Sequence, residues 1–188
     1  MSVLIVQAIP WAASLAALIG SAASDLKARI IPNEFSVVIA ICGVALSLRL
    51  GSGEFWISVL AAVSVFVALG FLAHYGLIGG GDVKLITAVT LLVPPGSVGL
   101  LLIEIALAGG IVSLFYFAAG HLLRRLPQFR ASIAKTRRKS GFGKWLRRES
   151  SRIARGYPVP YALAVLGGVA THIVRELPQC LFAVSCSQ

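Results

Sequence analysis

The feature that most constrains how this chain can fold is its continuous runs of about twenty apolar residues. A helix needs this length to cross a bilayer. The chain has 188 residues, of which 57% are hydrophobic and only 13% are charged. A soluble domain carries about 25% charged residues. In lipid, backbone polar groups must bond within helices or closed barrels, and barrel strands alternate apolar and polar residues. The runs here are unbroken, so we predict an all-α, polytopic helical membrane protein.

About six transmembrane helices are expected, within a single membrane-embedded domain over residues 1–188. Glycines within the runs suit close packing of helices in lipid. No internal repeat indicates a transporter built from two halves. The fourth helix is short because Pro94 and Pro95 stop it, so it needs its neighbours in order to span. The expected helices are 3–24, 35–50, 56–75, 83–94, 97–120 and 158–175.

The first apolar run, Val3 to Ala23, has an alternative interpretation as a cleaved signal peptide. No Lys or Arg precedes it, and it is longer than the 7–15 residues typical of a signal peptide's apolar region. We therefore expect this run to be a spanning helix.

Positive charge is concentrated in one loop at about 121–157, which predicts the orientation of the bundle. This loop holds twelve Lys and Arg residues, and its only acid is Glu149. Positive loops stay in the cytoplasm, so counting helices back places 76–82 and 25–34 on the cytoplasmic side and both termini outside. Lys27, Arg29 and Lys84 agree with this orientation.

Two of the seven acidic residues then fall at the same membrane edge. Asp25 ends a helix that runs inward, and Asp82 begins one that runs outward. Carboxylates at the edge of hydrocarbon are costly and are functional candidates by default. Two that meet can share one proton, as in acid proteases, so that one activates water and the other polarises the scissile carbonyl. Because such a pair titrates jointly, the sequence assigns neither role to either residue.

The run Gly79-Gly80-Gly81 precedes Asp82. Glycine permits positive φ and close approach of another chain, so we expect a flexible segment that places Asp82 as the cap of a helix N-terminus. A simple turn with a capping Asp remains the alternative.

Three segments together resemble the type IV prepilin peptidases. Asp25 is followed by Ile31-Pro32-Asn33, and Gly79-Gly80-Gly81-Asp82-Val83-Lys84-Leu85 is similar to the family's G-x-G-D motif. Pro158-Val159-Pro160-Tyr161-Ala162 is similar to the Pro-Tyr pattern that opens the family's last helix. The resemblance covers most of the chain.

The resemblance implies a multi-pass aspartic endopeptidase of the bacterial inner membrane that removes short basic leaders from prepilins or pseudopilins on the cytoplasmic side. It implies no cofactor. Larger members carry paired C-x-x-C motifs and also N-methylate the new terminus. This chain has neither motif and looks like the short form of tight-adherence (Flp-type) pili, so methylation is not expected. Asp25 and Asp82 would be catalytic, with Gly79, Gly80, Gly81, Lys84, Pro32 and Asn33 in the substrate-binding loops.

The basic loop departs from the family pattern. Apolar residues such as Phe129, Phe142 and Trp145 interleave its charges, which favours an amphipathic segment on the anionic inner leaflet. Nucleic acid is the rival partner for a basic run, but a loop tethered at a membrane favours anionic lipid.

The remaining polar residues carry weaker predictions. Cys42, Cys180 and Cys186 lack metal-ligand spacing, so no metal site is predicted; Cys180 and Cys186 could pair in an oxidising compartment. His74, His121 and His172 stand alone in the sequence and are expected at membrane interfaces. Glu104 should face the bundle interior and bond an unidentified neighbour, as a structural contact rather than a proton relay.

Two other functions remain open. One is a broader G-x-G-D intramembrane protease, which the position of the acids at the membrane edge disfavours. The other is a non-enzymatic membrane subunit or small ion- or proton-coupled transporter that uses the same acids. Replacing either Asp by Asn separates an enzyme, which loses cleavage but still inserts, from a structural role.

Overall fold

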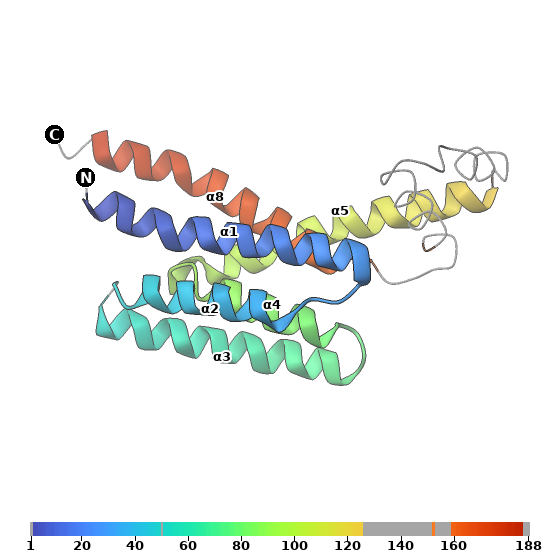
Figure 1. Ribbon diagram of the computed structural model, residues 1–188, viewed down its shortest axis with the longest axis horizontal. Coiled ribbons are helices and arrows are strands. Elements are labelled where there is room, and N and C mark those ends of the chain that lie inside the picture. Colours follow the sequence, from blue (N-terminus) through green and yellow to red (C-terminus); the bar gives the residue numbers. More distant parts are fainter. Residues whose placement is uncertain (1, 50, 126–151, 153–158, 186–188) are drawn as a thin grey trace. The chain divides into compact units, whose positions relative to one another are not determined.

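The computed structural model describes residues 2–49, 51–125, 152 and 159–185 (Figure 1). The chain divides into two compact units, the first formed by Met1–Ala108 with Pro160–Gln188 and the second by Gly109–Val159. Each unit is considered by itself. The basic loop at 121–157 falls almost entirely outside the described residues, as does Cys186, so the predictions of lipid binding and of a Cys180–Cys186 pair remain predictions.

The described residues are helical and contain no strand, which confirms the all-α prediction. The helices follow the apolar runs, but α4 begins within the glycine run and α8 continues well beyond the expected end at 175. Only the part of α5 up to Ala108 belongs to the first unit. The elements are α1 (Ser2–Ala28), α2 (Asn33–Ser47), α3 (Ser52–His74), α4 (Gly80–Thr90), the 3₁₀ turn η1 (Pro95–Ser97), α5 (Val98–Arg125) and α8 (Tyr161–Ser185).

Three helical stretches are long and apolar enough to cross a membrane, Ala8–Ala28, Ser52–His74 and Pro95–Leu122. The chain is therefore a membrane protein, as its composition predicts. Helix α2 is a shorter apolar helix. Helix α4 has 11 residues and extends only about 16 Å at 1.5 Å per residue, which is about half of a hydrocarbon core.

Helix α4 lies at the centre of the first unit and packs against α2, α3 and α8. Most of its side chains are buried, including Leu85 and Val89. Its last turn approaches α2 closely at Gly43, where a Cβ would lie 2.6 Å from the Cβ of Leu91. Only a residue without a side chain permits this distance. Packing against the neighbouring helices therefore holds α4 in place, although the helix is too short to span the hydrocarbon core by itself.

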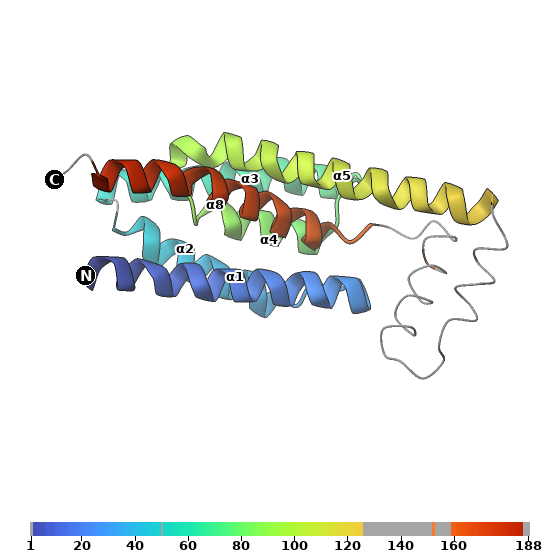
Figure 2. The ribbon, with the colours of Figure 1, turned by 90° about the horizontal axis from the view of Figure 1, so that it is seen from above.

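Four chain segments meet at one end of the first unit. The end of α1, the start of α2, the turn between α3 and α4, and the start of α8 lie at the same end in both views (Figures 1 and 2). The start of α1 lies at the opposite end. Asp25 lies at the end of α1, and Asp82 lies at the start of α4, directly after the turn from α3, so the fold brings them to one end of the bundle.

Candidate active site

Asp25 lies in the last turn of α1 and is buried, with 6% of its surface exposed. Its Oδ2 accepts a hydrogen bond of 3.1 Å from the backbone N–H of Ala162, in the first turn of α8. The first N–H groups of a helix have no partner within the helix and carry a partial positive charge. The carboxylate of Asp25 therefore caps α8 and ties it to α1.

Asp82 lies in the first turn of α4, whose N-cap is Gly79 in an extended conformation, with φ of −72° and ψ of 140°. The Asp82 carboxylate accepts a hydrogen bond from the backbone of Gly79. This is the arrangement in which an acid at the third helical position bonds back to the N-cap N–H. The prediction that Asp82 itself is the N-cap is wrong, because the N-cap is Gly79, three residues earlier.

The positive φ that the glycine run was expected to permit is not found. Gly80 and Gly81 belong to α4, and the positive-φ glycines among the described residues are Gly51 and Gly76. What constrains Gly79 is space, since a Cβ there would lie 2.8 Å from Oδ2 of Asp82. A Cβ on Gly80 would meet nothing within 4 Å, and one on Gly81 would make ordinary contact with Ile31 at 3.5 Å.

A cavity of about 370 Å³ brings the two aspartates together. All of the site residues predicted from the sequence line it except Pro32, which instead is the N-cap of α2. Sequence analysis did not assign Arg29, Ile30 or Ile31 to the site. The lining residues are Asp25, Arg29, Ile30, Ile31, Asn33, Gly79, Gly80, Gly81, Asp82 and Lys84.

The pKa of the Asp82 carboxyl is raised from an ordinary value of 3.8 to about 6. Burial is the largest cause, the negative charge of Asp25 also raises the pKa, and the hydrogen bond from Gly79 lowers it. The charge of Asp82 also acts on Tyr161, the first residue of α8. Asp25, Asp82 and the start of α8 thus form one electrostatic unit, and Asp82 keeps its proton to a higher pH than a free aspartate.

Lys84 lies one turn beyond the start of α4 and donates a hydrogen bond of 3.1 Å from Nζ to Oδ1 of Asn33. This bond joins the first turn of α2 to α4 at the edge of the cavity. Both residues belong to the sequence motifs, 51 positions apart, and the fold makes them direct partners.

Arg29 is the residue with positive φ among the described non-glycine residues, at 58°. Its backbone N–H donates a hydrogen bond of 2.9 Å to the carbonyl oxygen of Asp25, where α1 ends. Glycine usually occupies this left-handed position after a helix, and a larger residue there is strained, as is common at functional sites. The sequence carries no glycine to signal the turn, which is why its role at the cavity was missed.

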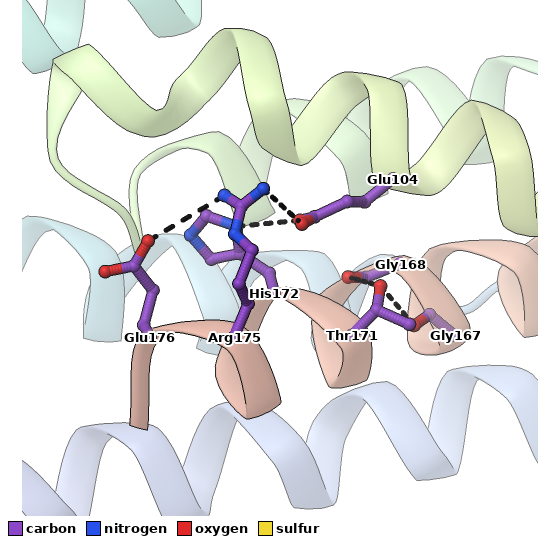
Figure 3. A network of polar contacts seen from close by, with 7 residues as sticks. All are labelled: Glu104, Gly167, Gly168, Thr171, His172, Arg175 and Glu176. Carbon is purple, nitrogen blue, oxygen red and sulfur yellow. Dashed lines mark hydrogen bonds and ion pairs between the residues drawn. The ribbon is translucent and has the colours of Figure 1, made fainter. Parts of the chain in front are cut away.

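A second polar cluster joins α5 and α8 within the first unit (Figure 3). Nδ1 of His172 lies 2.7 Å from Oε2 of Glu104, and Nη1 of Arg175 lies 3.1 Å from its Oε1. Glu104 therefore has the partner that the sequence could not identify. The prediction of an isolated, interfacial His172 is wrong, because this side chain is buried and pairs with a residue 68 positions earlier.

In the part of the chain that the structure describes, no group of three or more His, Cys, Asp or Glu side chains could hold a metal ion.

Comparison with known proteins identifies one family. The family model of the type IV leader peptidases matches residues 12–114, which include both aspartates and the glycine run. Searches of curated proteins and of solved structures gave no significant match.

Proposed function

Because the chain belongs to the type IV leader peptidase family, we propose that Asp25 and Asp82 are the catalytic pair of an aspartic endopeptidase. The substrate would be a prepilin or pseudopilin, whose short basic leader is removed. The observation that carries this proposal is the shared cavity, in which the charge of one aspartate acts on the other. Two coupled carboxyl groups that share a proton are the arrangement that aspartic proteases use to hydrolyse peptides.

The surroundings of the two carboxyl groups support different roles for them. Asp25 receives the N–H of Ala162 at the positive end of α8, which stabilises a negative charge. Asp82 has a pKa of about 6 and so keeps its proton to a higher pH than a free aspartate does. In this proposal Asp25 is the general base and Asp82 is the acid that donates a hydrogen bond to the scissile carbonyl.

The reaction then follows in two steps. Asp25 takes a proton from water as its oxygen bonds to the carbonyl carbon, and Asp82 gives its proton to the carbonyl oxygen. The tetrahedral intermediate collapses when the C–N bond breaks, the leaving amine takes the proton from Asp25, and Asp82 recovers its own. The pair ends with the same single proton with which it began.

The proposed location is the bacterial inner membrane, with the cavity at the cytoplasmic edge. The positive charge of the loop at 121–157 supports this orientation, because such loops stay inside. The proposal extends to the short, Flp-type form without methyltransferase activity. Anionic lipid is the proposed partner of the basic loop.

The test is cleavage of a co-expressed prepilin by Asp25→Asn and Asp82→Asn variants at matched amounts of inserted protein. Each variant is expected to lose at least ~1,000-fold in rate, equivalent to about 4 kcal/mol of barrier. The double variant should be no worse than either single one, since effects within a catalytic unit are non-additive. Glu34→Gln, which removes an exposed acid next to the cavity residue Asn33, is the control and should cleave normally. Substantial cleavage by either Asp variant removes that residue from the mechanism, and lost insertion instead of lost cleavage indicates a non-enzymatic subunit.

A further inference from the structure

A second hollow of about 380 Å³ lies beside the catalytic cavity, between α2 and α4 with one wall from α3. Its lining follows one face of α2 and one face of α4, because the lining residues of each helix recur at positions i, i+3, i+4 and i+7. Both faces begin with a polar residue and become apolar away from the cavity. This groove is lined by Asn33, Ser36, Val37 and Ala40 of α2, by Lys84, Thr87, Ala88 and Leu91 of α4, and by Phe66 of α3.

The groove adjoins the catalytic cavity, because Asn33 and Lys84 line both. The hydrogen bond between these two side chains marks the boundary. A peptide held with its scissile bond at the aspartates can therefore leave the cavity past this pair and enter the groove. Beyond the boundary the peptide would contact Val37 and Phe66, two apolar side chains that are about half exposed.

Thr87 gives the groove unused hydrogen-bonding capacity. A helical threonine commonly donates to the carbonyl four residues earlier, as Thr90 does to Ile86 at 2.9 Å. The hydroxyl of Thr87 is shielded from solvent and has no partner. Rotation about χ1 exchanges its hydroxyl and methyl groups. A chain that must be unwound for cleavage exposes backbone N–H and C=O groups that need partners in an apolar setting, and this hydroxyl can supply one.

We propose that the substrate carries an apolar segment directly after the scissile bond and that this groove binds it. The inference rests on the proposed function and specifies which side of the scissile bond lies in the groove. The positive charge of Lys84 at the boundary disfavours passage of a basic leader, whereas the apolar lining favours the segment on the other side of the cut.

The first test compares two adjacent valines of α2. Val37 lines the groove and Val38 does not, yet both are exposed, so Trp at either position is accommodated without disturbing the core. Two substrates are used: a full prepilin, and a short soluble peptide that covers only the leader and the scissile bond. We expect Val37→Trp to lower kcat/KM for the prepilin at least ~10-fold more than for the short peptide. Val38→Trp should leave the ratio of kcat/KM between the two substrates the same as in the wild type.

A second variant, Thr87→Val, separates an effect on substrate binding from a loss of folding. Removing a buried hydroxyl that has no partner should be neutral or stabilising, so Thr87→Val should keep or raise the thermal unfolding midpoint. If the groove binds substrate, Thr87→Val nevertheless slows prepilin cleavage, and Thr87→Ser retains it. Thr90→Val, off the groove, is the control.

Photo-crosslinking from position 66 in an Asp82→Asn background identifies the occupant. An adduct with the apolar segment of the prepilin supports the proposal. An adduct only with lipid or with a second copy of the chain overturns it, as does an unchanged substrate ratio in Val37→Trp. If the wild type cleaves neither substrate, the proposed function fails, and the assignment of this groove fails with it.

Discussion

The carboxylate of Asp25 and the backbone N–H of Ala162 form a hydrogen bond of 3.1 Å across 137 positions of sequence. This bond couples the candidate active site to the start of the last helix. It places a backbone donor and the positive end of α8 at the Asp25 carboxylate. Among the described residues, no helix from a distant part of the chain begins at the Asp82 carboxylate in this way. The asymmetry supports a division of roles that the sequence leaves open.

The first prediction concerns pH. Because Asp82 has a raised pKa of about 6, its protonated form is lost as the pH rises through that value. If this form is required, kcat/KM should fall above about pH 6, by up to tenfold per unit. A series of cleavage rates with the purified protein between pH 5.5 and 8 measures this. A flat profile over that range would exclude Asp82 as the protonated partner.

The second prediction tests the coupling of the two acids. The negative charge of Asp25 contributes to the raised pKa of Asp82, so Asp25→Asn should lower the pKa of Asp82 while burial still holds it above 3.8. Carbodiimide labels the protonated carboxyl, and the pH at which labelling of Asp82 is half complete should shift downward. Glu54→Gln, at an exposed position of α3, should leave it unchanged. An unshifted midpoint in Asp25→Asn would show that the two groups do not interact.

The helices were predictable because lipid leaves the backbone few alternatives. Each apolar run has to satisfy its own hydrogen bonds, so the runs became helices. The approach of Asp25 and Asp82 to one end followed from counting helices between charged loops. The partner of Asp25 was not predictable, since it depends on how α8 packs against α1. The same is true of Glu104 and His172, which are 68 positions apart.

The glycine run shows where a local rule failed. Glycine is a poor helix former, which favoured a flexible turn, yet Gly80 and Gly81 begin α4. Most of the side chains that follow in α4 are buried, and the packing of this helix overrides the weak propensity of its first residues. A side chain at position 79 would crowd the Asp82 carboxylate beside it, a contact that the sequence does not reveal.

A third prediction concerns Glu104. Its carboxylate contacts both His172 and Arg175, so Glu104→Ala leaves buried His172 without its partner and should lower the free energy of unfolding by about 1–3 kcal/mol. Glu104→Gln should cost less. Thermal unfolding in detergent measures the loss, with Glu54→Ala as an exposed control. Cleavage per folded molecule should not change; lost cleavage in Glu104→Gln at normal stability would indicate a proton relay instead.

A fourth prediction concerns orientation. The loop at 121–157 should be cytoplasmic and the C-terminal tail outside, because positive loops stay inside. In a Cys42→Ala variant, a membrane-impermeant thiol reagent applied to intact cells should label Cys180 or Cys186. In a variant without the native cysteines, Ser140→Cys should be labelled only after the cells are lysed. The reverse pattern would invert the topology and place the aspartates on the outer side.

The last prediction separates a spatial role of the glycines from a flexible one. A methyl group at position 79 would lie 2.8 Å from Oδ2 of Asp82, a distance that real Cβ atoms avoid, so Gly79→Ala has to displace this carboxylate or the start of α4. We expect cleavage to fall at least ~10-fold, equivalent to about 1.4 kcal/mol of barrier, with normal insertion. Gly80→Ala is the matched control, because its methyl group meets nothing within 4 Å and alanine favours the helix.

Gly81→Ala should also be tolerated, since it makes only ordinary contact with Ile31. Processing of a co-expressed prepilin at equal enzyme levels ranks the three variants. If flexibility were what the site requires, all three substitutions would stiffen the run and reduce cleavage to a similar extent. A selective loss in Gly79→Ala instead identifies the space beside Asp82 as the property that catalysis needs, because the three positions are adjacent and differ mainly in what a side chain would meet.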